Sequence, residues 1–192
     1  MIRIGILGDI GSGKSYIAKK FGFPVFNADE EVAKLYKKNK KIFTKLKKSL
    51  PKYIETFPIS KKEISKAILG NKNNLPKIIK IIHSEVRKRM YFFLKKNKGK
   101  KIIILDIPLL LENKINKKKD VIIFVDASKT QIYKRLRKRT NFNLELVKKF
   151  KKLQLPIEFK KKKSSFIIKN NFKNKSLKKD VKKIREKILN NA

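Results

Sequence analysis

The fold class of this chain is decided by the stretch Gly8-Asp9-Ile10-Gly11-Ser12-Gly13-Lys14-Ser15, which matches without a gap the phosphate-binding pattern G-x-x-x-x-G-K-[ST]. The apolar run over residues 1–7 predicts a buried strand before it. Apolar residues at helical spacing from Ile17 to Phe21 predict a helix after it. A strand, a glycine-rich loop and a helix in this order are the context that the pattern requires, and this context disfavours a chance glycine-rich turn.

The residue types in this stretch suit a nucleotide triphosphate. Glycines allow backbone N–H groups to turn inward around phosphate oxygens, and the start of the following helix faces the same anion. Lys14 can reach the β- and γ-phosphates, and the Ser15 hydroxyl can bind Mg²⁺. We therefore expect ATP to be bound by Gly8, Asp9, Ile10, Gly11, Ser12, Gly13, Lys14, Ser15 and Tyr16.

The length of 192 residues predicts one compact domain, large enough to bury about 70% of its unfolded surface without disulfide bonds. There is no cysteine, which fits a cytosolic protein. The first apolar run is too short for a signal peptide, and no run approaches the roughly 20 residues that span a bilayer. We therefore expect a cytoplasmic protein with no membrane partner.

The formal net charge of +39 has two explanations. A basic face can bind nucleic acid by releasing counterions from phosphates. Alternatively, the charge reflects a bias toward A- and T-rich codons, because Lys, Asn, Ile and Phe are all abundant and only seven of the 54 basic residues are Arg. Specific nucleic-acid sites favour Arg. We favour codon bias and expect no specific nucleic-acid partner.

Strand and helix patterns alternate along the rest of the chain. Continuous apolar runs at 102–106 and 121–126 each end in Asp and predict buried parallel strands. Short strands are also predicted at 25–26 and 166–168. Residues 30–90 have a mostly helical pattern with breaks at Pro51, Pro58, Gly70 and Pro76, and further helices are predicted at 129–139, 144–153 and 176–189. This alternation predicts an α/β fold with a parallel sheet. The lysine run 160–163 is predicted to be solvated.

Two acids follow predicted strands, where ligands bind in open α/β sheets. Asp29 could orient or deprotonate an attacking hydroxyl, or it could cap a helix. Asp106 could hold Mg²⁺, or it could satisfy N–H groups of a turn. We favour the functional role for each.

Two further features carry candidate chemistry. Arg135, Arg137 and Arg139 lie on one short segment of a Lys-rich chain and suggest a lid over the transferred phosphate, the alternative being a solvated basic helix. His83 is the only histidine, and from its apolar neighbours alone it is more readily explained as a packed residue than as a catalyst.

Seven segments together are similar in order and spacing to one known family. They are Ile4–Ser15, Asn27-Ala28-Asp29, Ile82-His83-Ser84 with Val86-Arg87, Asp106–Glu112, Gln131 with Arg135 and Arg139, Gln154–Glu158, and Asn170. Nearly the whole chain thus resembles the dephospho-CoA kinases, which use ATP to phosphorylate the ribose 3′-hydroxyl of dephospho-CoA. The chain departs from the family pattern at Asp9, Asn27, Ser84, Lys163 and Ser165.

The resemblance implies a P-loop kinase with a parallel-sheet core, a helical substrate-binding insertion and a small lid. It implies a core at about 1–29, 99–134 and 164–192, a CoA-binding lobe at about 30–98 and a lid at about 135–163. We expect a monomer that binds ATP, Mg²⁺ and dephospho-CoA. Another P-loop kinase, such as a nucleoside monophosphate kinase, and a basic nucleic-acid-binding ATPase are the alternatives.

The loop pattern, the strand ends and the resemblance together assign roles to single residues. Catalysis is assigned to Asp29, Lys14 and Arg139, and nucleotide binding to the loop 8–16 with Asn170. Substrate binding is assigned to Asp29, His83, Arg87, Asp106, Pro108 and Leu109. Mg²⁺ binding is assigned to Ser15 and Asp106.

Overall fold

The computed structural model describes residues 1–140 and 142–190. The chain forms two compact units, one made of residues 1–27 and 97–192 and the other of residues 28–96. Because the first unit is assembled from both ends of the chain, the second is an insertion between two of its strands.

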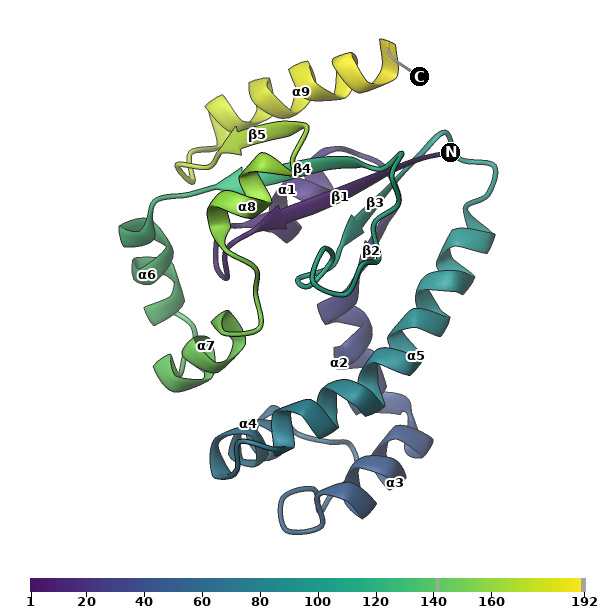
Figure 1. Ribbon diagram of the computed structural model, residues 1–192, viewed down its shortest axis with the longest axis vertical. Helices are drawn as coiled ribbons and strands as arrows, with labels where there is room; N and C mark the ends of the chain where they lie inside the picture. Colours follow the sequence, from purple (N-terminus) through teal and green to yellow (C-terminus); the bar gives the residue numbers. More distant parts are fainter. Residues whose placement is uncertain (141, 191–192) are drawn as a thin grey trace. The chain divides into compact units, whose positions relative to one another are not determined.

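The first unit contains a five-stranded parallel sheet (Figure 1). Its strands in spatial order are β2 (Val25–Asn27), β3 (Ile102–Asp106), β1 (Ile2–Gly8), β4 (Val121–Asp126) and β5 (Phe166–Lys169). All five residues of β3 are buried, as the continuous apolar runs predicted for strands covered on both faces. The α/β fold with a parallel sheet is confirmed.

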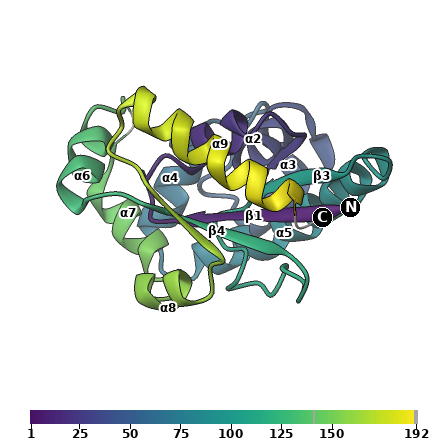
Figure 2. The same cartoon turned by 90° about the horizontal axis from the view of Figure 1, so that it is seen from above.

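Helices cover both faces of this sheet. The helix α1 (Lys14–Lys20) and the short helix α8 (Ile157–Lys162) lie on opposite faces (Figure 1 and Figure 2). The closing helix α9 (Asn174–Asn190) packs on β5 and α1. Apolar residues of α1, α9 and the strands form one buried core, in which Phe21 is fully inaccessible. This packing holds the ends of the strands in position, so the loops that follow the strands also meet at a defined position.

Two more helices belong to the first unit. The basic helix α6 (Lys129–Arg137) follows β4 and ends two residues earlier than predicted, and α7 (Leu144–Lys151) follows it. The Ser128 side chain accepts a hydrogen bond from the Gln131 N–H and caps α6. The helix α8 was not predicted, because its lysine-rich sequence shows no apolar periodicity.

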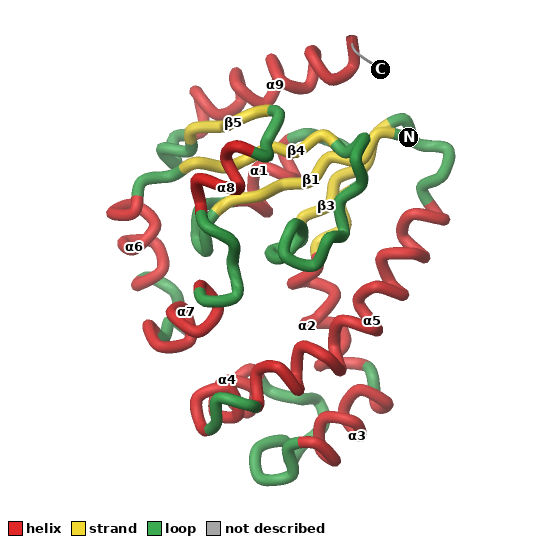
Figure 3. Tube along the Cα trace, in the orientation of Figure 1, coloured by secondary structure: helices red, strands yellow, loops and turns green. Residues whose placement is uncertain are grey.

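The second unit consists of helices and connecting loops within residues 28–96 (Figure 3). The helices are α2 (Ala28–Lys38), α3 (Lys40–Ser49), α4 (Lys61–Gly70) and α5 (Asn74–Lys96). The sequence predicted a break at Pro76, but this prediction is wrong. Pro76 lies in the first turn of α5, where proline is tolerated, and the helix continues through it. α5 also continues six residues beyond the predicted end at Met90. Within the described residues, the structure contains no helix with the length and apolarity needed to cross a membrane.

Candidate active site

The loop over residues 9–13 connects β1 to α1, and its two glycines, Gly11 and Gly13, both have positive φ. Gly13 has φ +92°, a conformation that side chains rarely adopt. A Cβ atom there would lie 2.5 Å from Asn170 Nδ2. Both the backbone conformation and the space therefore require glycine at this position.

Lys14 reaches back over this loop. Its ammonium nitrogen donates to the carbonyl oxygens of Asp9 at 2.8 Å and Gly8 at 3.1 Å. Ser15, the next residue of α1, is half-buried. The loop thus holds one cation and one hydroxyl at the start of α1, which are the groups that the pattern assigns to phosphate and Mg²⁺.

Asn170 supports the loop from the end of β5. This residue is buried, and its Nδ2 donates to the Ser12 carbonyl at 2.8 Å. Its Oδ1 accepts the Phe172 N–H at 2.9 Å, and its own N–H donates to the Asp126 carbonyl at 2.6 Å. Asn170 therefore joins three segments of the first unit and holds the phosphate loop at a fixed position.

A cavity of about 130 Å³ opens beside Gly13 and Asn170. Arg135 and Phe172 line it, with the Arg135 guanidinium carbon 4.2 Å from the Phe172 ring centroid. Tyr16, which was predicted from the loop, lines it as well. Arg135 is one of the three arginines that the sequence indicated, but the role in catalysis was assigned to Arg139. Phe172 was not predicted as a site residue.

Arg139, the arginine selected from sequence, does not line this cavity. It is exposed and follows the end of α6 in a turn, where its N–H donates to the Leu136 carbonyl at 3.1 Å. It therefore lies outside the helix on which the family resemblance placed it.

Asp106 and Asn27 lie opposite each other at the ends of β3 and β2. Both residues are buried, and Asn27 Nδ2 donates to Asp106 Oδ2 at 2.8 Å. Two carboxylates in this position would repel each other, so the asparagine that replaces the family's acid stabilises the Asp106 carboxylate instead. Within the described residues there is no group of three or more His, Cys, Asp or Glu side chains that could hold a metal ion.

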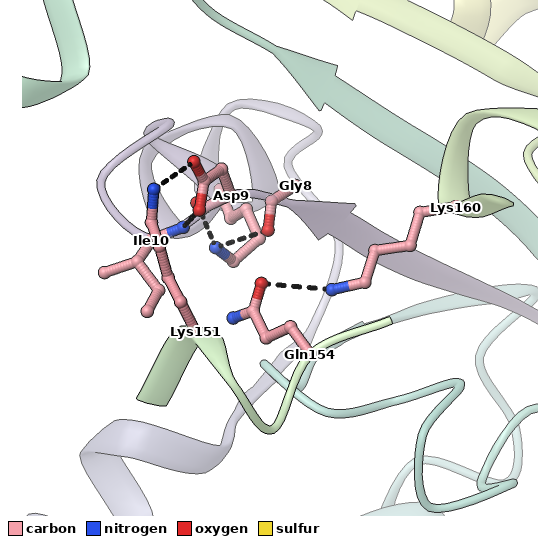
Figure 4. A network of polar contacts seen from close by, with 7 residues as sticks. Gly8, Asp9, Ile10, Lys151, Gln154 and Lys160 are labelled. Atoms are coloured by element: carbon pink, nitrogen blue, oxygen red, sulfur yellow. Dashed lines mark hydrogen bonds and ion pairs between the residues drawn. The ribbon is translucent and has the colours of Figure 1, made fainter. Parts of the chain in front are cut away.

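A buried charge pair contradicts one prediction from sequence. Lys160 was predicted to be solvated, but its side chain is only 2% exposed and pairs with Glu112 Oε1 at 2.8 Å. Lys160 Nζ also donates to Gln154 Oε1 at 3.1 Å (Figure 4), and Glu112 Oε1 accepts the Leu155 N–H at 3.0 Å. The burial of Lys160 could not be predicted within a run of four lysines, because only packing distinguishes this residue from its neighbours.

Comparison with known proteins identifies the family. The dephospho-CoA kinase family profile matches residues 2–176. This chain belongs to the dephospho-CoA kinase family. A dephospho-CoA kinase of Wolbachia pipientis wMel is 37% identical over 170 residues, which cover 86% of this chain and 87% of the relative.

Two solved structures share the fold of this dephospho-CoA kinase family member. TT1252 from Thermus thermophilus is 25% identical, with a TM-score of 0.77 and coverage of 97% of both chains. A dephospho-CoA kinase from Campylobacter jejuni is 24% identical, with a TM-score of 0.65 and coverage of 97% of this chain and 96% of that structure.

Three residues that the family resemblance assigns to catalysis or substrate lie in the helical unit. Asp29 is exposed in the first turn of α2, which begins at Ala28. His83 is half-buried on α5, and Arg87 is exposed one turn later. Burial, and then the positive charge of Arg87, lower the pKa of His83, which favours the neutral imidazole.

Pro108 and Leu109 belong to the first unit. Both are half-buried in the segment that follows Asp106 at the end of β3. The roles that the resemblance gives to these two residues, and to Asp29, His83 and Arg87, stay predictions.

Proposed function

We propose that this protein transfers the γ-phosphoryl group of ATP to the ribose 3′-hydroxyl of dephospho-CoA, which yields coenzyme A and ADP. One observation carries the proposal: the family match covers residues 2–176 and includes an intact phosphate loop on a parallel sheet. The alternatives from the sequence are another P-loop kinase, such as a nucleoside monophosphate kinase, and a nucleic-acid-binding ATPase, and neither is the family that the chain matches.

ATP binding is assigned to the loop 8–16 with Asn170. On binding, the Lys14 ammonium exchanges the carbonyls of Gly8 and Asp9 for phosphate oxygens, which are better partners because they are charged. The cavity lined by Arg135 and Phe172 lies beside the loop and would accept the base of the nucleotide. Arg139 is assigned to the charge of the transferred group, because phosphoryl transfer depends mainly on positioning and charge neutralisation.

The donors present fit Mg²⁺. Ser15 offers a hydroxyl, and Asp106 offers a carboxylate that the Asn27 amide orients. Mg²⁺ in kinases is held by one or two protein groups together with phosphates and water, so a cage of protein ligands is not needed. When bound, the ion would neutralise charge on the phosphate oxygens.

Asp29 is assigned as the base. It lies two residues beyond Asn27, which ends β2, and the carboxyl ends of parallel strands are where ligands bind in such sheets. Its carboxylate would accept the 3′-hydroxyl proton while the hydroxyl oxygen bonds to the γ-phosphorus. The bond from that phosphorus to the bridging oxygen then breaks and ADP leaves. The helical unit, with His83 and Arg87, is assigned to dephospho-CoA, together with Pro108 and Leu109.

The substitution Asp29→Asn tests the proposal. Asparagine keeps the size of the side chain but cannot accept the proton, so we expect kcat with dephospho-CoA to fall by about 10²- to 10⁴-fold. Mg·ATP binding and the melting temperature should stay unchanged. Glu30→Gln is the matched control, since Glu30 is an exposed acid in the same helical turn. ADP release is measured with dephospho-CoA and with a panel of nucleoside monophosphates.

Two outcomes would contradict the proposal. Wild-type turnover in Asp29→Asn would remove Asp29 from the catalytic step. Faster turnover of any nucleoside monophosphate than of dephospho-CoA would contradict the proposed substrate.

A further inference from the structure

The phosphate loop contains a nearly buried negative charge. Asp9 is 6% exposed, and its Oδ1 accepts the Ile10 N–H at 2.7 Å. The carbonyl of the same residue lies 2.8 Å from the Lys14 ammonium nitrogen. A carboxylate is therefore built into the backbone turn that should receive a polyphosphate, and a carboxylate removed from water needs a partner.

Lys151, the last residue of α7, supplies that partner. Its Nζ lies 3.0 Å from Asp9 Oδ2, although the two residues are 142 positions apart in the sequence (Figure 4). The pair is asymmetric: the lysine side chain is 47% exposed, while the aspartate side chain is 8% exposed. Because the lysine is about half exposed, water can replace part of its contact with Asp9, so removal of Lys151 costs less folding stability than removal of a fully buried partner. The main effect of the pair is electrostatic, because Lys151 cancels the charge of Asp9 inside the loop.

We propose that Lys151 is a positioning residue for ATP, which neutralises Asp9 so that the phosphate loop can accept the polyphosphate. Without it, the Asp9 carboxylate would face phosphate oxygens of the same sign. At an effective dielectric constant of about 20, an uncompensated charge about 6 Å from one phosphate charge would weaken binding by about 100-fold, and screening by about 0.1 M salt reduces this loss to about tenfold. The inference rests on the proposed function, since it assumes that this loop binds ATP.

The test measures Mg·ATP binding by titration calorimetry without dephospho-CoA, in a two-by-two set of variants. Lys151→Ala should raise the Kd for ATP by about tenfold. In the Asp9→Asn background, the same change should raise Kd by less than about threefold, because asparagine keeps the acceptor for the Ile10 N–H but carries no charge. Lys152→Ala is the control, because it removes an adjacent exposed lysine.

Two further readouts separate electrostatics from a structural role. The effect of Lys151→Ala should grow from AMP through ADP to ATP, and it should shrink when the salt concentration is raised from about 0.1 M to about 1 M. Melting temperatures report whether each variant is folded. If alanine unfolds the protein, Lys151→Gln keeps the aliphatic stem and replaces it in the same set.

Each other outcome overturns the inference. An equal loss of ATP affinity in both backgrounds would mean that Lys151 acts on the phosphates without Asp9. No loss in either background would mean that the ion pair has no part in ATP binding. A wild-type protein that fails to bind Mg·ATP would refute the proposed function itself, whereas wild-type binding without coupling refutes only the role of Lys151.

Discussion

The buried pair of Lys160 and Glu112 allows one quantitative prediction. The substitution Lys160→Met keeps most of the side-chain length and volume but removes the charge. Glu112, whose side chain is 9% exposed, would then lose the ammonium group that lies 2.8 Å from its Oε1. Its Oε2 is buried and has no hydrogen-bond partner among the described residues, so this oxygen cannot compensate for the loss.

The expected cost follows from this environment. Removal of one member of a buried ion pair typically costs about 3–5 kcal/mol, because the remaining charge stays desolvated. The Gln154 amide oxygen also loses its donor at 3.1 Å, a smaller loss of about 1 kcal/mol that is not fully additive. For a protein of 192 residues, a loss of about 3–5 kcal/mol lowers Tm by roughly 6–20 °C.

Two variants isolate the cause in urea and thermal unfolding experiments. Lys160→Met combined with Glu112→Gln removes both charges and keeps an acceptor for the Leu155 N–H, so it should recover most of the lost stability. Lys161→Met is the matched control: its side chain is 28% exposed and pairs with Asp126 at 3.5 Å, and it should cost less than about 1 kcal/mol. A loss of stability in Lys160→Met no larger than that in Lys161→Met would contradict a cost from the unpaired Glu112 carboxylate, and so would a double variant less stable than the single one.

Three further predictions concern the phosphate loop and acid stability. Lys14→Ala should lower kcat/KM in steady-state kinetics by a factor that corresponds to about 3–4 kcal/mol of lost transition-state stabilisation. The Tm of this variant should stay unchanged. Gly13→Ala should cost at least about 1–3 kcal/mol of stability and weaken ATP binding. The added Cβ would clash with Asn170, and the backbone at this position has a φ of +92°, which alanine rarely adopts. Burial raises the pKa of Glu63, but N–H groups including that of Ser60 outweigh it and lower the pKa to about 2. Since this folded pKa lies below the ordinary value of 4.5, the stabilisation is complete above that pH and is lost as the pH falls toward 2. Urea unfolding of Glu63→Gln should lack this part of the acid dependence.

The parallel sheet and the phosphate loop could be predicted from the sequence, because both depend on local patterns. Continuous apolar runs identify strands buried on both faces, as in β3 and β4. The loop could be located because only Gly is compatible with positions such as Gly13, and because Lys14 and Ser15 follow at a fixed spacing. The family resemblance rested on the same kind of local signal, and the comparisons confirmed it.

The buried charges and the long-range contacts could not be predicted from the sequence, because they depend on the packing of the whole chain. Lys160 lies in a run of four lysines, yet it alone of them is buried, because α8 packs against the sheet and points it at Glu112. The approach of Lys151 to Asp9 brings together residues from distant segments, and so does the stacking of Arg135 on Phe172. Burial and long-range contact are properties of the packed chain, since they depend on how helices and strands are assembled rather than on the order of neighbouring residues.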